Sequence, residues 1–297
     1  MKRKRWLAMA LVFCLLGTTV PLTALAAGED GEVQYIVSND GTTLTIQGDG
    51  EITSQALDAN VTAEQKKTLT SVEIGAGVTG IADGYSSVFP AGVTNVTLKG
   101  SGAFRFGKYS FKGQKNLTVQ SERTSLAIGS YAFHNAVLTE FPMDQLHTIG
   151  SYGFSNAVLP LEGETLTLRI EDQVDVEAQY PAISVGSCAF SGVKNKEGTA
   201  FSKASVTIGG TVQFGDYSFN ASDVFGSSAA LEELTFHLKE GAYLIFGGGA
   251  LGIPALRSAV FTGTGQIDFQ HPSYRYVQAA PFRNGKQVET LDFSGFT

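Results

Sequence analysis

Two glycine-rich segments have spacings similar to those of nucleotide-binding loops. Residues 75–80 follow an expected strand and match, in outline, the Gly-x-Gly-x-x-Gly pattern that holds a dinucleotide at a helix N-terminus. The chain continues with turn-like residues 81–86 instead of the helix that this chemistry requires. Residues 102–109 nearly match a phosphate-binding loop, but Tyr109 stands where Ser or Thr would hold Mg²⁺. We interpret both segments as parts of a repeat and predict no cofactor.

Histidine, cysteine and serine side chains are the other candidates for chemistry. The spacing of the histidines does not match HExxH or the Cys/His patterns of zinc sites, so we expect surface histidines and no metal site at His134, His147, His237 and His271. Cys188 stands where other copies of a repeat have tyrosine, which favours a packed thiol over a nucleophile. No nucleophile-elbow motif accompanies the serines. We therefore predict no catalytic residues and no enzymatic activity.

Four tyrosines recur at equivalent places in the repeat, namely Tyr109, Tyr131, Tyr152 and Tyr217. If they lie in register on successive coils, they could form an exposed strip that stacks on sugar rings or anchors a protein partner. In the alternative, which we favour, they pack between coils and expose only their hydroxyl groups. The four tyrosines are the candidate binding residues of this chain.

These tyrosines belong to a six-residue block that occurs six times, at residues 106–111, 128–133, 149–154, 185–190, 214–219 and 246–251. Its first residue is always large and apolar, so we expect it to point inward. The second is always Gly, which indicates either a positive φ or close approach to a neighbouring coil. The fifth is always small, and the sixth is Phe in five copies, which predicts an aromatic ladder. The residues that define the repeat are Gly107, Phe111, Gly129, Phe133, Gly150, Phe154, Gly186, Phe190, Gly215 and Phe219.

Strand-like segments lie between the blocks. The pattern apolar-x-x-apolar-x-apolar ends in the two-residue spacing of one strand face, and it occurs at residues 69–74, 93–98, 231–236 and 288–293. Residues 166–170 and 206–208 are further strand-like runs. Successive block glycines are 22, 21, 36, 29 and 32 residues apart, so the first two intervals fit a leucine-rich-repeat period and the others need insertions. The sequence predicts a mainly β fold, a right-handed leucine-rich-repeat solenoid with short strands and irregular turns.

The strand at residues 69–74, the Val-Thr-x-Ile turn at residues 78–81 and the Ile-Gly-x-x-Ala-Phe block together resemble the BspA-like leucine-rich repeat of bacterial surface proteins. Residues 40–50 are similar to the β leader that often precedes such arrays. We therefore divide the chain into a signal peptide at 1–26, an N-terminal β leader or cap at 27–64 and the repeat solenoid at 65–297. Thr297 directly follows a strand-like run without a polar cap, so a C-terminally truncated array is an open alternative.

The first 27 residues have the layout of a secretory signal peptide. A basic cluster at residues 2–5 precedes an apolar stretch at 6–16 and the small residues Ala24 and Ala26, which predict cleavage after Ala26. Cleavage removes four positive charges, so the net charge of −7 becomes −7 − 4 = −11. Such a surface repels nucleic acid, and cleavage leaves no segment for membrane insertion. We expect a secreted or cell-surface protein.

The resemblance implies adhesion, because BspA-like proteins bind host matrix components or other cells. We therefore expect a binding or adhesion module that recognises an extracellular protein or glycan through a face of the solenoid. The alternative is a structural repeat domain of a larger surface protein. A carbohydrate-active enzyme is the least favoured class.

Overall fold

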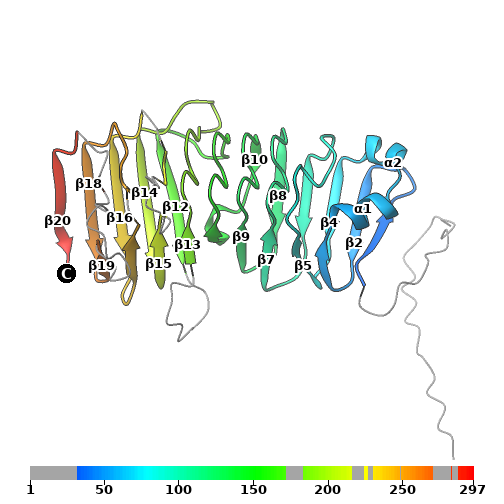
Figure 1. Ribbon diagram of the computed structural model, residues 1–297, viewed down its shortest axis with the longest axis horizontal. Coiled ribbons are helices and arrows are strands. Elements are labelled where there is room, and N and C mark those ends of the chain that lie inside the picture. Colours follow the sequence, from blue (N-terminus) through cyan, green and yellow to red (C-terminus); the bar gives the residue numbers. More distant parts are fainter. Residues whose placement is uncertain are drawn as a thin grey trace, which may run out of the picture.

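The computed structural model describes residues 32–171, 183–215, 224–226, 230–247, 249–269, 282 and 287–297. The expected signal peptide at residues 1–26 lies outside these residues, as do Tyr217, Phe219 and His271. The described chain is mainly β, as predicted, and its strands form a row along the long axis of the molecule (Figure 1).

Three sheets contain these strands. The first sheet has six strands, β1 Gln34–Val37, β2 Thr43–Gln47, β4 Ser71–Ile74, β6 Asn95–Leu98, β8 Leu117–Ser121 and β10 Leu138–Glu140. The long sheet has nine, β3 Gly50–Ile52, β5 Val78–Ile81, β7 Ala103–Phe106, β9 Ser125–Ile128, β11 Leu146–Ile149, β13 Ile183–Val185, β15 Thr211–Phe214, β17 Tyr243–Phe246 and β19 Gln266–Asp268. The third sheet has five, β12 Thr165–Glu171, β14 Lys203–Gly209, β16 Glu233–Leu238, β18 Ser258–Gly263 and β20 Thr290–Phe296.

From β2 onward, successive strands alternate between the long sheet and one of the other two sheets. The stretch from one strand of the long sheet to the next is called a unit below. All strand pairs are parallel except β1 with β2, which places an antiparallel strand at the outer edge of the first sheet. The first sheet ends at β10 and the third begins at β12, so only the long sheet continues through the whole row.

Matched apolar side chains join the strands into one core. Leu44 of β2 lies opposite Val72 of β4, which lies opposite Val96 of β6, and all three are fully buried. The first residue of every block is also buried, as the sequence predicts. At the other end of the row, Leu291 and Phe293 of β20 are 50% and 40% exposed, because β20 is the outermost strand of its sheet. The alternation of apolar residues at 288–293 therefore predicted more burial than the structure shows for this strand.

Helices fill the passage between β3 and β4. Helix α1 spans Ser54–Asn60 and α2 spans Ala63–Thr68, and a 3-10 helix, η1, spans Met143–Gln145 between β10 and β11. Thr53 caps α1 by accepting from the amide of Ala56, and Thr62 with Gln65 forms a capping box at α2. The repeat pattern does not predict these helices, although the capping box at Thr62 is a visible signal in the sequence.

The sixth residues of the blocks form a ladder of phenyl rings inside the molecule. Phe111, Phe133, Phe154 and Phe190 stack in order with centroid distances of 5.6, 5.4 and 5.6 Å. The ladder extends to Phe89 at one end and to Phe225 at the other. Residue Phe225 was not singled out by the repeat, because its distance from Gly215 does not match the block.

The block glycine is required mainly by close packing between units. A Cβ on Gly150 would lie 2.6 Å from the amide nitrogen of Ser130, and one on Gly186 would lie 2.5 Å from that of Ser151. Gly215 differs, since its φ is 91°. Block glycines donate to the first block residue of the preceding unit, for example Gly150 to the carbonyl of Ile128 at 2.7 Å. Close approach of a neighbouring unit therefore explains the glycine at Gly150 and Gly186, and Gly215 adopts a positive φ.

Candidate functional site

The fourth residue of the block lies at a turn with left-handed backbone. The amide of the fifth residue donates to the carbonyl of the second, as from Ala132 to Gly129 at 3.1 Å. The fourth residue has positive φ in each described block that has a side chain there, with values of 64° at Tyr109, 59° at Tyr131, 60° at Tyr152 and 54° at Cys188. In the sixth block this position is Gly249, with φ of 72°.

Glycine is the residue that such a turn normally takes, because a side chain in the left-handed region clashes with its own backbone. The cost is about 1–2 kcal/mol for each non-glycine residue. Three large aromatic residues therefore occupy positions at which the turn itself would favour glycine. Backbone strain of this kind is concentrated at functional sites.

The three tyrosines stack on one another, and we call Tyr109, Tyr131 and Tyr152 the tyrosine row. The ring centroids are 5.2 Å apart between Tyr109 and Tyr131, and 4.7 Å apart between Tyr131 and Tyr152, where the rings are inclined by only 7°. Backbone hydrogen bonds fix this register, since the amide of Tyr131 donates to Ser151 and that of Tyr152 donates to Ser187. The register on successive units, which the sequence offered only as a condition for a binding strip, is therefore present for the three tyrosines that the structure describes.

Both ends of the row are covered. The ammonium groups of Lys108 and Lys112 each lie 5.1 Å from the centre of the Tyr109 ring. At the other end, Tyr152 forms a side-chain hydrogen bond with Cys188, which occupies the same block position in the next unit. The faces of the rings are therefore covered by neighbouring rings, by the two lysines or by Cys188. A ligand at this surface would contact the ring edges and the hydroxyl groups instead. All four block residues are half-buried.

Two phenols of the row, those of Tyr131 and Tyr152, ionise less readily than free tyrosine. Burial is the main cause that raises the pKa of Tyr131, with repulsion from ionised Tyr109 and Cys188 adding to it. The pKa of Tyr152 is raised first by its hydrogen bond with Cys188. At neutral pH Tyr131 and Tyr152 therefore present neutral hydroxyl groups that can donate and accept hydrogen bonds.

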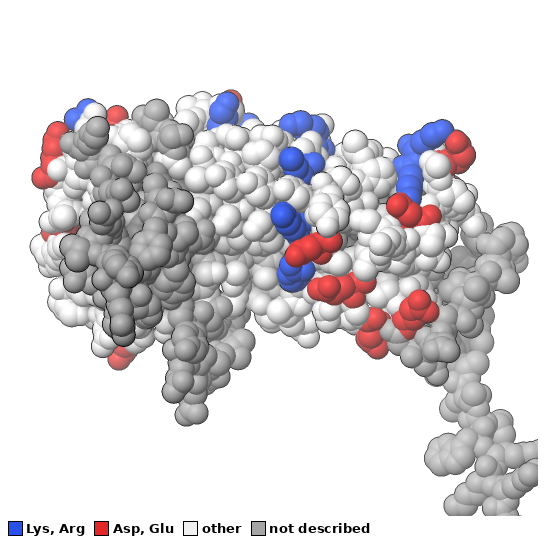
Figure 2. All heavy atoms as spheres, viewed as in Figure 1, with Lys and Arg blue, Asp and Glu red and all other residues white. Residues whose placement is uncertain are grey.

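On the C-terminal side of Lys108 and Lys112, the segments around the row are polar but uncharged. Residues 125–137, 146–158 and 183–193 contain no Lys, Arg, Asp or Glu, and their polar side chains come from Ser, Thr, Asn and His. Figure 2 shows a broad uncharged area on the C-terminal side of a row of basic side chains that crosses this face over β7 and β8. Hydroxyl and amide groups in such an area suit hydrogen bonding to a neutral partner.

The other sequence candidates are dispersed. The ring of His134 lies edge-on to Tyr131 at 5.6 Å, and burial followed by the charge of Lys112 lowers the pKa of His134. Nδ1 of His237 lies 2.6 Å from Oγ1 of Thr262, in a different part of the chain. Within the residues that the structure describes, no three His, Cys, Asp or Glu side chains gather in a way that could hold a metal ion.

The two glycine-rich segments lie within the sheet framework. Gly80 falls inside β5, where it faces Arg105 of β7, and residues 102–109 include all of β7. Neither segment forms a loop at the start of a helix, so the geometry for binding phosphate groups at a helix N-terminus is absent from both.

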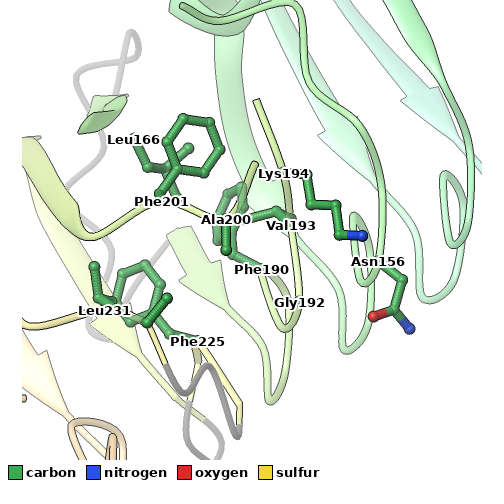
Figure 3. Close-up of a pocket in the computed structure, with 11 residues that line it drawn as sticks. Asn156, Leu166, Phe190, Gly192, Val193, Lys194, Ala200, Phe201, Phe225 and Leu231 are labelled. Atoms are coloured by element: carbon green, nitrogen blue, oxygen red, sulfur yellow. The ribbon is translucent and has the colours of Figure 1, made fainter. Parts of the chain in front are cut away.

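A separate apolar pocket of about 390 Å³ lies near the change from the first sheet to the third. Figure 3 shows Phe201 beside Leu166 on one side and Phe225 beside Leu231 on the other. Lys194 extends away from the rings toward Asn156 and is the only charged residue among the described residues of the lining. The volume is in the range of small-ligand sites, but the lining supplies apolar contact and few polar groups to orient a ligand.

No protein-family model, curated protein or solved structure matches the chain. Within the described residues, none of the helices has the length and apolar character that crossing a membrane requires. The functional argument therefore rests on the geometry of the tyrosine row and its surroundings.

Proposed function

We propose that the protein is a secreted or surface-associated binding module, and that the face containing the tyrosine row contacts an extracellular protein or glycan. The observation that carries this proposal is the placement of Tyr109, Tyr131 and Tyr152 at positive φ. Since each costs about 1–2 kcal/mol relative to glycine, an aligned row of phenols is a feature that folding alone does not require.

We further propose that the units form a right-handed leucine-rich-repeat solenoid of the BspA-like kind, with residues 27–64 as its cap. The alternation of strands between sheets, the in-register blocks and the first two repeat intervals support this assignment. The basic, apolar and small-residue segments of residues 1–26 support secretion. The polar uncharged face and the absence of a recognised catalytic motif support binding in place of catalysis.

The test compares residues 27–297 with a variant in which Tyr109, Tyr131 and Tyr152 are all replaced by glycine. Glycine suits the positive φ, so the variant removes the rings without adding backbone strain. Both proteins are applied to an array of matrix proteins, mucin and cell-wall glycans, after far-UV circular dichroism has verified folding. We expect the wild type to bind at least one component and the variant to lose at least about tenfold in affinity.

Tyr85→Gly is the matched control, because Tyr85 is fully exposed and lies outside the row. It should bind like the wild type. Equal binding by the triple variant would show that the row is not the contact surface, and a wild type that binds no component would favour the structural-domain alternative.

A further inference from the structure

Three lysines surround the N-terminal end of the tyrosine row, and we call Lys108, Lys112 and Lys115 the lysine cluster. Lys108 and Lys112 lie over the Tyr109 ring, and Lys115 reaches the next unit, where its ammonium donates to the carbonyl of Asn135 at 3.0 Å. None of the three forms an ion pair with a carboxylate of the described residues.

Other lysines of this chain do have such partners. Lys67 lies 2.7 Å from Glu64 and Lys99 lies 3.0 Å from Glu122. The chain has more acidic than basic residues, 28 against 21, so carboxylates are not scarce. The lysine cluster is therefore a local departure from the pairing seen at Lys66, Lys67 and Lys99.

Two of the charges lie near the same aromatic ring. Because both ammonium groups lie 5.1 Å from one ring centre, Lys108 and Lys112 cannot be farther apart than twice that distance. Like charges at this separation repel each other, and the ring's quadrupole attracts both. An anion that approaches Tyr109 would be attracted by both ammonium groups and would reduce their mutual repulsion.

The surroundings limit the kind of anion. On the N-terminal side Arg105 already pairs with Asp83 and Glu51, so acidic groups flank the cluster there. On the C-terminal side the uncharged face begins at residue 125 (Figure 2). A polymer with a charge on every unit would meet repulsion from the acidic protein as a whole. A polymer with sparse anionic groups on a hydroxylated chain matches both the cluster and the neutral face.

We propose that the lysine cluster binds a sulfate or carboxylate group of an acidic polysaccharide, whose neutral sugars continue over the tyrosine row. This inference rests on the proposed binding function and names the chemical class of its ligand. The phenol hydroxyls, serines and asparagines form hydrogen bonds with the sugars, and the lysine ammonium groups pair with the anionic group.

The experiment measures binding of immobilised residues 27–297 to a sparsely substituted dextran sulfate, in which most sugars carry no sulfate, and to unmodified dextran at several salt concentrations, by biolayer interferometry. The two polymers have the same sugar backbone and differ in their sulfate groups. We expect dextran sulfate to bind, dextran to bind at least about tenfold more weakly, and the affinity for dextran sulfate to fall as salt rises.

The variant is Lys108→Gln/Lys112→Gln/Lys115→Gln, and its matched control is Lys66→Gln/Lys67→Gln/Lys99→Gln. Both variants change the net charge equally, but only the first removes lysines near the row. We expect the first to lose at least about tenfold in affinity and to reduce the salt slope by up to about one unit per lysine, and the control to change little.

Three outcomes would overturn the inference. Equal losses in both variants would mean that net charge alone attracts the polymer. Equal binding of dextran would place recognition on the neutral face, which would leave the proposed function standing. Tighter binding of a single-stranded oligonucleotide or of poly-glutamate than of dextran sulfate would assign the cluster to another class of polyanion. Failure of the proposed function is distinguishable, because the array would then show no binding that depends on the tyrosine row.

Discussion

Single residues in this protein occupy positions that the backbone alone would assign to glycine. Tyr131 illustrates this, with φ of 59°, the ring of Tyr152 stacked on one side and the tilted ring of Tyr109 on the other. The stacked contacts, each about 0.5–1.5 kcal/mol, are of the same size as the backbone cost of about 1–2 kcal/mol. The ring contacts therefore offset much of the backbone cost, and stability changes little when the row is present.

The first prediction concerns alkaline pH. The unfolded chain ionises its tyrosines at about 10, and the folded chain resists ionisation of Tyr131 and Tyr152, whose pKa values are raised. Their contribution to stability is complete below pH 10 and is lost as pH rises from there through the folded pKa values. We expect Tyr131→Phe/Tyr152→Phe, which keeps the rings, to lose less stability above pH 10 than the wild type.

Urea unfolding between pH 8 and pH 11, together with tyrosinate absorbance, measures this difference. Tyr85→Phe serves as the control, because its side chain is fully exposed. Identical pH profiles for the wild type and the double variant would contradict the shielding of these phenols.

A second prediction distinguishes two reasons for a glycine, namely lack of space for a Cβ atom and a positive φ. In Gly150→Ala the new Cβ meets the backbone at Gly129 and Ser130, and neither can move without disturbing the hydrogen bonds between units. We expect a loss of about 2–3 kcal/mol in the free energy of unfolding. Gly163→Ala, with φ of 71° and open space around it, should lose only about 1 kcal/mol. Similar losses at both positions would argue against close packing as the reason for the block glycine.

The sequence predicted the block well because each of its positions has one dominant physical demand. Inward apolar residues, the glycine, the small fifth residue and the stacked phenylalanines all follow from close parallel packing. It did not predict the positive φ at Tyr109, Tyr131 and Tyr152, because tyrosine is not a residue that signals this conformation. Gly249 in the sixth block was the one available indication.

At the scale of elements, Arg123 joins turns that are far apart in sequence. Its guanidinium donates to the carbonyls of Gly75, Ala76 and Val78 at 2.8–3.2 Å and lies over the Phe104 ring. The side chain is buried, so its removal would take a buried donor from each of these carbonyls, and Gly75 would keep only the amide of Val78. The turn after β4 and the turn after β8 are thereby tied together.

The third prediction follows from this contact. Arg123→Met should lower the free energy of unfolding by about 3 kcal/mol, because buried hydrogen bonds to a charged group are lost. Arg257→Met, at an exposed arginine beside Glu232 and Glu289, should cost less than about 1 kcal/mol. Chemical denaturation of both variants provides the comparison, and a tolerated Arg123→Met would show that water replaces the guanidinium.

Strand positions were predictable where apolar alternation is strong, as in β4, β6, β12, β14 and β16. The helices between the strands were harder to predict. Helices α1 and α2 are short and depend on caps at Thr53 and Thr62, and the 3-10 helix η1 has no side-chain cap. Local signals of that length are weak beside a repeat that dominates the pattern of the whole chain.

At the scale of the whole molecule, charge is distributed unevenly. The lysine cluster, the uncharged face and the acidic groups beside Arg105 follow one another along the row of strands, although the chain as a whole is acidic. The amino-acid composition predicted only the net charge of the chain. The order of the charged and uncharged regions along the strands could not be predicted from composition, because side chains from several units combine on one face.

The change of partner sheet between β10 and β12 has a mechanical consequence. The strands lie across the long axis, so a force that pulls the two ends of the row apart acts along the hydrogen bonds between neighbouring strands and opens them one pair at a time (Figure 1). Elsewhere two sheets share that tension, but at the change only the long sheet continues as a sheet, beside the hydrogen bonds between block turns and the isolated bridges at Val158 and Lys194. Under load the row would therefore part there first, and each half would keep its own paired sheets.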